Sequence, residues 1–312
     1  MPMSSEIVHP LDLETLELFR LKGTEGGCGT IQIGNANGVK VRRVMQITSD
    51  FAQASFHQLK IIDFACGEGV YAIEAALRGA EVLAVDARTE RMNDGARAAE
   101  RLGLTNLRFE QTDVRGVNLG SHGMFDVIFF LGILYHLDYQ DVFPVLNNIY
   151  EMCQRFVIID THIALRGQHS VQHHGQTYDG LRVLEHADTD SEEVRRSRLG
   201  ASLDNPFSFQ FTKESLFRLL NNVGFTCVCE CIVPLEADKP EGRITIVATK
   251  GKRVTLSSYP WVNDKTEDDI KRFLDELASR SPSPKPVSRI SQLAKSRVQT
   301  ALRRFGLEIR RV

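Results

Sequence analysis

Residues 60–72 read KIIDFACGEGVYA, an apolar run that ends on an acid and passes into two glycines spaced by one residue. The apolar positions that follow, through Ile73 and Leu77, have helical spacing. Glycines at 67 and 69 permit positive φ and let a ligand approach the main chain closely. The stretch therefore predicts a strand, a ligand-binding turn and a helix packed back on the strand.

The same turn fits two kinds of cofactor. The spacing Gly67-x-Gly69-x-x-Ala72 satisfies the dinucleotide fingerprint, in which a pyrophosphate sits at the helix N-terminus. Asp63 and Glu68 would place two carboxylates beside that anionic group, whereas they suit a cation. S-Adenosylmethionine carries a sulfonium and an ammonium group and has no phosphate. An NAD-dependent dehydrogenase remains the alternative.

At this loop the chain resembles the class I S-adenosylmethionine-dependent methyltransferases, whose first motif is an acidic strand end followed by a Gly-x-Gly loop. Ala65 stands where the family usually has the first of three glycines. The resemblance covers roughly residues 55–250 and implies S-adenosyl-L-methionine as the methyl donor.

Apolar runs and helical patterns alternate after residue 60. We expect strands at 61–64, 81–85, 107–110, 125–131 and 155–159, and helices at 69–79, 89–103 and 140–153. This order is typical of parallel βαβ units. A helix from Thr212 to Asn222 and two antiparallel strands, 225–233 and 243–249, follow. We predict an α/β, doubly wound, mostly parallel seven-stranded sheet closed by an antiparallel C-terminal hairpin, a Rossmann-like methyltransferase fold.

Ligands of open parallel sheets bind beyond the carboxyl ends of the strands. Asp86 ends the second strand about 20 residues after the loop, where a carboxylate accepts from both ribose hydroxyls. In the family, the acid that matches Asp113 accepts from the adenine amino group. The candidate donor-binding residues are Asp63, Ala65, Gly67, Gly69, Asp86, Asp113, Val114, Leu131 and Gly132.

The segment from Gly132 to His136 resembles a motif of the methyltransferase branch that includes the tRNA wobble-uridine carboxymethyltransferases and related small-molecule enzymes. The resemblance puts Tyr135 and His136 beside the methyl group. His136 would act as general base, because a hydroxyl acceptor loses its proton and histidine titrates near neutrality. A purely structural buried histidine is the alternative. Tyr135 and His162 complete the candidate catalytic set.

Residues 161–210 are polar, His-rich and too long for a simple connection, which indicates an insertion with a function. By the same resemblance they form the acceptor side of the pocket, with His174, Tyr178, Glu185 and His186 as candidates. The spacing of the histidines fits no familiar metal-ligand pattern, so we expect no metal. A solvated polar loop is the other interpretation.

Composition limits the remaining function classes. The 312 residues are 42% hydrophobic and 25% charged, as in ordinary soluble proteins. No apolar run approaches ~20 residues and the N-terminus lacks a signal-peptide pattern, so we expect no membrane span and a cytoplasmic protein. The net charge is −2, but residues 285–312 carry +7 and the remainder −9.

The expected acceptor is a hydroxyl or carboxylate of a small metabolite, such as a sugar or a secondary metabolite. Modification of a tRNA wobble uridine is the alternative. The basic tail favours it, while the acidic body disfavours it, because an RNA-binding face is broadly basic. We expect an N-terminal extension (1–55), the methyltransferase domain (56–250) with its insertion (161–210), and a linker with a basic helical tail (251–312). Within the extension we expect one short helix in residues 1–25, a loop over 26–38, and either a helix or a strand over 39–58. The sequence does not predict the oligomeric state.

Overall fold

The computed structural model describes residues 36–232, 239–251, 271–272 and 275. The chain divides into two units, Met1–Arg253 and Val254–Val312, and the fold described below belongs to the first. The helix expected in the first 25 residues and the helices expected in the basic tail lie outside the described residues.

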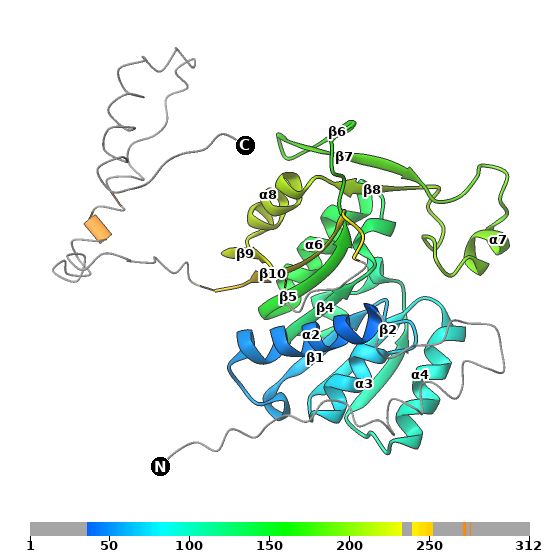
Figure 1. Ribbon diagram of the computed structural model, residues 1–312, viewed down its shortest axis with the longest axis vertical. Helices are drawn as coiled ribbons and strands as arrows, with labels where there is room; N and C mark the ends of the chain where they lie inside the picture. Colours follow the sequence, from blue (N-terminus) through cyan, green and yellow to red (C-terminus); the bar gives the residue numbers. More distant parts are fainter. Residues whose placement is uncertain (1–35, 233–238, 252–270, 273–274, 276–312) are drawn as a thin grey trace. The chain divides into compact units, whose positions relative to one another are not determined.

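A seven-stranded sheet with the order β3-β2-β1-β4-β5-β10-β9 forms the centre of this unit (Figure 1). Its strands are β1 (Lys60–Phe64), β2 (Glu81–Asp86), β3 (Leu107–Gln111), β4 (Phe125–Leu131), β5 (Cys153–His162), β9 (Cys227–Glu230) and β10 (Arg243–Thr249). Strands β1 to β5 are parallel, and β10 is antiparallel to both β5 and β9. The predicted sheet, with its antiparallel C-terminal hairpin, is confirmed.

Helices cover both faces of the sheet, which explains why its strands are apolar on both sides. The helices of this unit, apart from the insertion, are α2 (Ala36–Ala52), α3 (Val70–Leu77), α4 (Thr89–Arg101), α5 (Leu119–His122), α6 (Tyr139–Met152) and α8 (Lys213–Val223). Side chains of α2, α3 and α4 pack with Ile61 of β1 on one face. Side chains of α6 and α8 pack with the adjacent Ile62 on the other face.

The region left open between residues 39 and 58 is mostly helix α2. The loop expected over 26–38 is wrong at its end, because α2 begins at Ala36. Val41, Val44, Met45 and Thr48 are buried at helical spacing and bring α2 onto the sheet. Within the described residues, no helix is long and apolar enough to cross a membrane.

Helix α8 has the predicted ends. Thr212 is its N-cap, with the side-chain oxygen accepting from the backbone N–H of Ser215 at 3.3 Å, and Gly224 follows its last residue with a φ of +129°. The capping residues alone were therefore enough to predict where this helix begins and ends.

The insertion contains a second sheet that the sequence did not predict. Strands β6 (His169–His173), β7 (Gln176–Leu184) and β8 (Phe207–Phe211) pair antiparallel in that order, and the short helix α7 (Glu192–Ser197) lies between β7 and β8. Strand β7 was not recognised in the sequence, because only alternate positions such as Tyr178 and Gly180 are buried and the exposed positions between them are mostly polar. Phe209 and Phe211 of β8 join the core beside α6.

Candidate active site

The carboxyl ends of the parallel strands border a cavity of about 280 Å³. Eight residues predicted from the sequence line it together: Ala65, Gly67, Asp86, Asp113, Val114, Gly132, Tyr135 and His136. Residues 199–203 and Asn205, from the segment after α7, also line this cavity. Asp63, Gly69, Leu131 and His162 do not line this cavity.

The loop after β1 has the backbone that its glycines indicated. Ala65, Gly67 and Gly69 have φ values of +53°, +55° and +72°. Ala65 therefore occupies a left-handed conformation that glycine adopts more easily, at the position where related loops carry glycine. At Gly69 a Cβ atom would lie 2.7 Å from the Phe109 ring, so no larger residue fits there without movement.

Asp86 is anchored by backbone groups at the edge of the cavity. One of its carboxylate oxygens accepts from the Gly67 N–H at 2.9 Å, and the other accepts from the Arg88 N–H at 2.8 Å. The carboxylate therefore connects the glycine loop to the end of β2. Each oxygen retains a second lone pair that can accept from a ligand hydroxyl.

The acids of the loop differ in how the protein compensates them. Glu68 forms an ion pair with Arg91 at 2.9 Å, so the protein itself compensates that acid. Asp63 is 1% exposed, and its Oδ2 atom has no hydrogen-bond partner among the described residues. Burial, with a further contribution from the charge of Asp86, raises the pKa of Asp63 to about 8. Asp63 itself does not line the cavity, so of the acids near the loop Asp86 is the one placed to face the positively charged groups of a bound S-adenosylmethionine.

The raised pKa of Asp63 has a measurable consequence for stability. The pKa of Asp63 is about 8 in the folded protein and near the ordinary value of 3.8 in the unfolded chain. Between these two pH values the Asp63 carboxyl group is protonated in the folded protein but ionised in the unfolded chain. The free energy of unfolding therefore falls as pH rises through this window. Asp63→Asn removes the titration, so the melting temperature of the variant minus that of the wild type should grow by roughly 5 °C between pH 5 and pH 8.

Differential scanning fluorimetry across this pH range measures that difference. Asp94→Asn, which removes an exposed acid on α4, controls for the loss of one negative charge. A difference for Asp63→Asn that stays flat or shrinks with pH would show that Asp63 is already ionised in the folded protein at pH 5.

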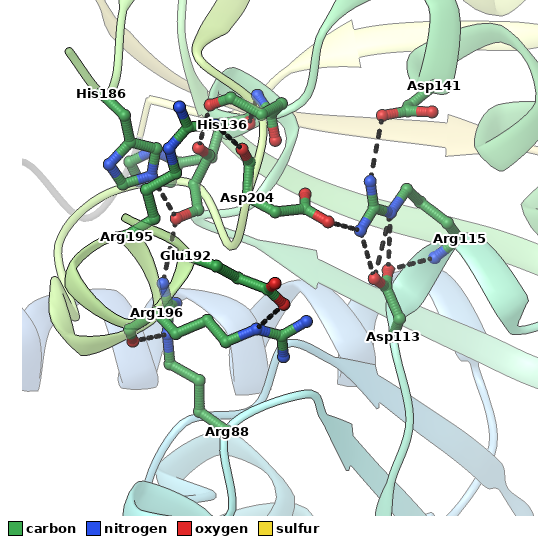
Figure 2. Close-up of polar contacts among 12 residues, drawn as sticks. Arg88, Asp113, Arg115, His136, Asp141, His186, Glu192, Arg195, Arg196 and Asp204 are labelled. Atoms are coloured by element: carbon green, nitrogen blue, oxygen red, sulfur yellow. Dashed lines mark hydrogen bonds and ion pairs between the residues drawn. The ribbon is translucent and has the colours of Figure 1, made fainter. Parts of the chain in front are cut away.

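Asp113 is held by the arginine two positions after it (Figure 2). Its carboxylate accepts from the backbone N–H of Arg115 at 2.9 Å and from the Arg115 guanidinium at 2.5–3.1 Å. Burial opposes ionisation of Asp113, but these hydrogen bonds outweigh it and hold its pKa below the usual value. Arg115 also bonds Asp204 at 2.9 Å and pairs with Asp141 at 3.6 Å.

His136 forms a pair with Glu185 of the insertion. Its Nδ1 atom lies 3.1 Å from both carboxylate oxygens of Glu185, which also accepts from Ser208 Oγ at 2.7 Å and from the Ser202 N–H at 2.9 Å. Burial opposes ionisation of Glu185, but the hydrogen bonds from His136 and Ser208 hold its pKa below the usual value. An ionised carboxylate only accepts, so we infer that Nδ1 carries a proton and that Nε2 can accept one.

A second polar cluster lies at the ends of β5 and β10. Arg243 donates to Asp160 at 2.6 Å and to His162 Nε2 at 3.3 Å, and its guanidinium lies 5.6 Å from the centre of the Tyr135 ring. Burial and the charge of Arg243 lower the pKa of His162. The sequence reasoning missed Arg243, although it is paired directly opposite His162 in the antiparallel register.

The four acceptor-side candidates fall into two separate places. Glu185 contacts His136, and the neighbouring His186 is buried with Nε2 at 3.0 Å from the Ser202 carbonyl oxygen. His174 and Tyr178 line a different cavity of about 340 Å³ beside α6 and α8. Among the described residues, no group of three or more His, Cys, Asp or Glu side chains is placed to hold a metal ion.

Comparison with known proteins agrees with this geometry. Residues 61–155 match a family described as "Methyltransferase domain". The ubiquinone biosynthesis O-methyltransferase of Acinetobacter baylyi (strain ATCC 33305 / BD413 / ADP1) is 27% identical over 104 residues, which are 33% of this chain and 41% of that protein. The chain thus matches less than half of the length of this curated relative.

Two solved structures share the fold. The N-terminal domain of EvdMO1 with SAH bound has a TM-score of 0.54 and 19% identity, and the match covers 67% of this chain and 80% of that one. The same domain in the presence of SAH and D-fucose has a TM-score of 0.55 and 18% identity, with 76% and 95% covered.

The strand order, the glycine loop and the acids at the strand ends are typical of a class I S-adenosylmethionine-dependent methyltransferase domain, and residues 61–155 match a methyltransferase-domain model. Within that class, the match of residues 61–155 is to the "Methyltransferase domain" family, and an O-methyltransferase is a distant relative. These findings favour the methyltransferase interpretation over the dehydrogenase.

Proposed function

We propose that this chain methylates an oxygen atom, a hydroxyl or carboxylate, of a small acceptor. When bound, S-adenosylmethionine supplies an electrophilic methyl group on a positively charged sulfur. The single observation that carries the proposal is the His136–Glu185 pair at the edge of the donor cavity, because it provides a base beside the transfer site. The name of the curated relative, an O-methyltransferase, supports an oxygen acceptor.

In this proposal each donor-site residue has a task that follows from its position. Asp86 accepts from the ribose hydroxyls, and Asp113 with Val114 lies at the adenine. Gly67 and Gly132 both have positive φ and both line the cavity, where the lack of a side chain lets a ligand approach the main chain. Holding donor and acceptor in line supplies most of the acceleration, because the donor is already activated.

His136 takes the proton when the acceptor is a hydroxyl. As the acceptor oxygen forms its bond to the methyl carbon, the bond from that carbon to sulfur breaks and its electron pair stays on sulfur. The hydroxyl proton moves to His136 Nε2, and the resulting imidazolium is stabilised by the ionised Glu185 at Nδ1. The Tyr135 ring lies next to this base, with its centre 4.2 Å from that of the His136 ring. The His162 ring lies next to Tyr135 in turn, with the two ring centres 4.7 Å apart.

A labelling experiment tests the acceptor class. The chain is incubated with S-adenosylmethionine carrying a tritiated methyl group and with cell extract separated into a metabolite fraction and a bulk tRNA fraction. We expect label in the metabolite fraction, bonded to oxygen. Label only in tRNA would overturn the acceptor class, and label in neither fraction, together with no donor binding, would overturn the donor.

One observation favours a second candidate, transfer from a donor with an additional carboxylate to a tRNA wobble uridine. Such a donor needs a cation close to the transferred group, and Arg243 beside Tyr135 and Gly132 is in that position. Asp160 already pairs with Arg243, which weakens this candidate. Competition between S-adenosylmethionine and its carboxylated form for binding to the chain distinguishes the two candidates. A preference for the carboxylated form that is lost in Arg243→Met would favour the second candidate.

A further inference from the structure

The segment that covers the donor cavity is attached at both of its sides to functional residues. Residues 198–205, which we call the strap, follow α7 and supply six of the residues that line the cavity: Leu199, Gly200, Ala201, Ser202, Leu203 and Asn205. The sequence assigned them to the acceptor side only as part of residues 161–210, and none was singled out as a site residue. The strap therefore forms a wall of the donor site.

Arg88 holds the strap through backbone carbonyl groups. Its Nη2 atom donates to the carbonyl oxygens of Arg198, Ala201 and Ser202 at 3.2, 3.1 and 3.0 Å, and its Nε donates to that of Arg196 at 3.3 Å. A planar guanidinium serves several acceptors at once, which a lysine ammonium does not do in this geometry. One side chain thus connects the end of β2 to the end of α7 and to the strap.

Arg115 repeats this arrangement at the end of β3 (Figure 2). In both Asp86-x-Arg88 and Asp113-x-Arg115, the arginine N–H donates to the aspartate Oδ1, at 2.8 and 2.9 Å. Both guanidinium groups then reach the strap, and that of Arg115 bonds Asp204 at 2.9 Å. Each of the two acids proposed to hold the donor is therefore followed, two positions later, by an arginine that bonds the strap.

The other side of the strap contacts the proposed catalytic pair. The Ser202 N–H donates to Glu185 at 2.9 Å, and the Asn205 side chain donates to the His136 carbonyl oxygen at 3.0 Å. Ser202 Oγ donates to the Asn205 carbonyl oxygen at 2.6 Å, which ties these two positions together. Ser202 is thus bonded to Arg88 through its carbonyl group and to Glu185 through its N–H.

We propose that the strap couples donor binding to the alignment of the His136–Glu185 pair, with Arg88 and Arg115 as positioning residues. This inference rests on the proposed function, since it assumes that the donor binds at Asp86 and Asp113. Coupling between two sites is reciprocal. A change at Glu185 that loosens Ser202 therefore weakens donor binding, and a change at Arg88 that loosens Ser202 disturbs Glu185.

A double-mutant cycle on the full chain tests the coupling without any acceptor. S-Adenosylhomocysteine affinity is measured by calorimetry for wild type, Arg88→Met, Glu185→Gln and the double variant. Each single change should weaken binding by about 5- to 50-fold, and the double variant should be at least about 5-fold tighter than the product of the single effects. Independent effects, or no effect of Glu185→Gln, would overturn the proposal.

Arg97→Met is the matched control, because Arg97 lies on helix α4, which begins directly after Arg88, and it is exposed and pairs with Asp94 rather than with the strap. It should bind S-adenosylhomocysteine within about 2-fold of wild type. Thermal unfolding of every variant verifies that the fold is retained.

Hydrogen exchange of residues 198–205 separates this proposal from the proposed function. In the ligand-free protein, exchange there should be faster in Arg88→Met than in wild type or Arg97→Met, and S-adenosylhomocysteine should slow it only when Arg88 is present. Unchanged exchange in Arg88→Met would overturn the strap proposal alone. A wild type that binds no S-adenosylhomocysteine would overturn both proposals, even if its strap exchanges as expected.

Discussion

Asp86→Ala should reduce S-adenosylhomocysteine affinity by roughly 10²- to 10⁴-fold. The variant loses a carboxylate that would accept from two ribose hydroxyls, and hydrogen bonds to charged groups contribute about 1.5–3 kcal/mol each. It also releases the Gly67 and Arg88 N–H groups, so the loop loses the acceptor that now holds it. Calorimetric titration of the purified chain measures this change.

Asp94→Ala is the matched control for that titration. Asp94 is an exposed acid on α4 that pairs with Arg97, away from the cavity. Its removal should leave affinity within about 2-fold of wild type. Binding by Asp86→Ala within a few-fold of wild type would show that the donor does not lie on this carboxylate.

His136→Ala should lower the turnover of a hydroxyl acceptor by roughly 10²- to 10⁴-fold, which is the usual contribution of a general base. S-Adenosylhomocysteine affinity should change far less, by about 5-fold or less, because the strap contacts the backbone carbonyl of His136, which the substitution retains. Release of tritiated product from the active metabolite fraction measures turnover, and calorimetry measures binding.

His169→Ala, an exposed histidine of β6, controls for the loss of an imidazole. Glu185→Gln should lie between His136→Ala and wild type in turnover, because it leaves the base present but removes the charge that stabilises the imidazolium. Wild-type turnover in His136→Ala would mean that the acceptor loses its proton elsewhere or carries none, as a carboxylate acceptor does.

The sheet could be predicted because its signals are local. Ile61 and Ile62 face opposite layers, so each strand is an apolar run, and Asp63 and Asp86 stand where such runs end. Parallel strands bring their carboxyl ends to one edge, so residues far apart in the chain could be assigned to one cavity. Strand identity and topology thus followed from short stretches of sequence.

The remainder of the site depends on contacts across long stretches of chain. Arg88 and Ser202 are separated by 114 positions, and Arg115 and Asp204 by 89, so no local pattern joins them. The repeated Asp-x-Arg spacing at 86–88 and 113–115 was a visible signal, but it did not indicate what the arginines bind. The second sheet was also missed: β6 is polar at four of its five positions, and the pairing of β7 with β8 joins segments that are separated by α7.

The placement of the histidines shows the same limit. His136, which was placed by its motif at a strand end, lines the donor cavity, whereas His174, which was placed on the acceptor side as part of the insertion, lines another cavity. Arg243 became significant only through the register of β10 on β5. The position of a residue at a strand end is therefore predictable from sequence, while its position inside an insertion depends on how the insertion folds.

The central claim is that the pocket above the sheet accepts a positively charged sulfur donor at Asp86 and Asp113. The three arginines that also line the pocket, Arg88, Arg91 and Arg115, are already bonded to carbonyl or carboxylate groups of the protein. Native mass spectrometry of the full chain, incubated with equal concentrations of S-adenosylmethionine and NAD, tests this directly. We expect one bound S-adenosylmethionine and its loss in Asp86→Ala. Bound NAD that Asp86→Ala removes, or no adduct with S-adenosylmethionine at all, would contradict the account.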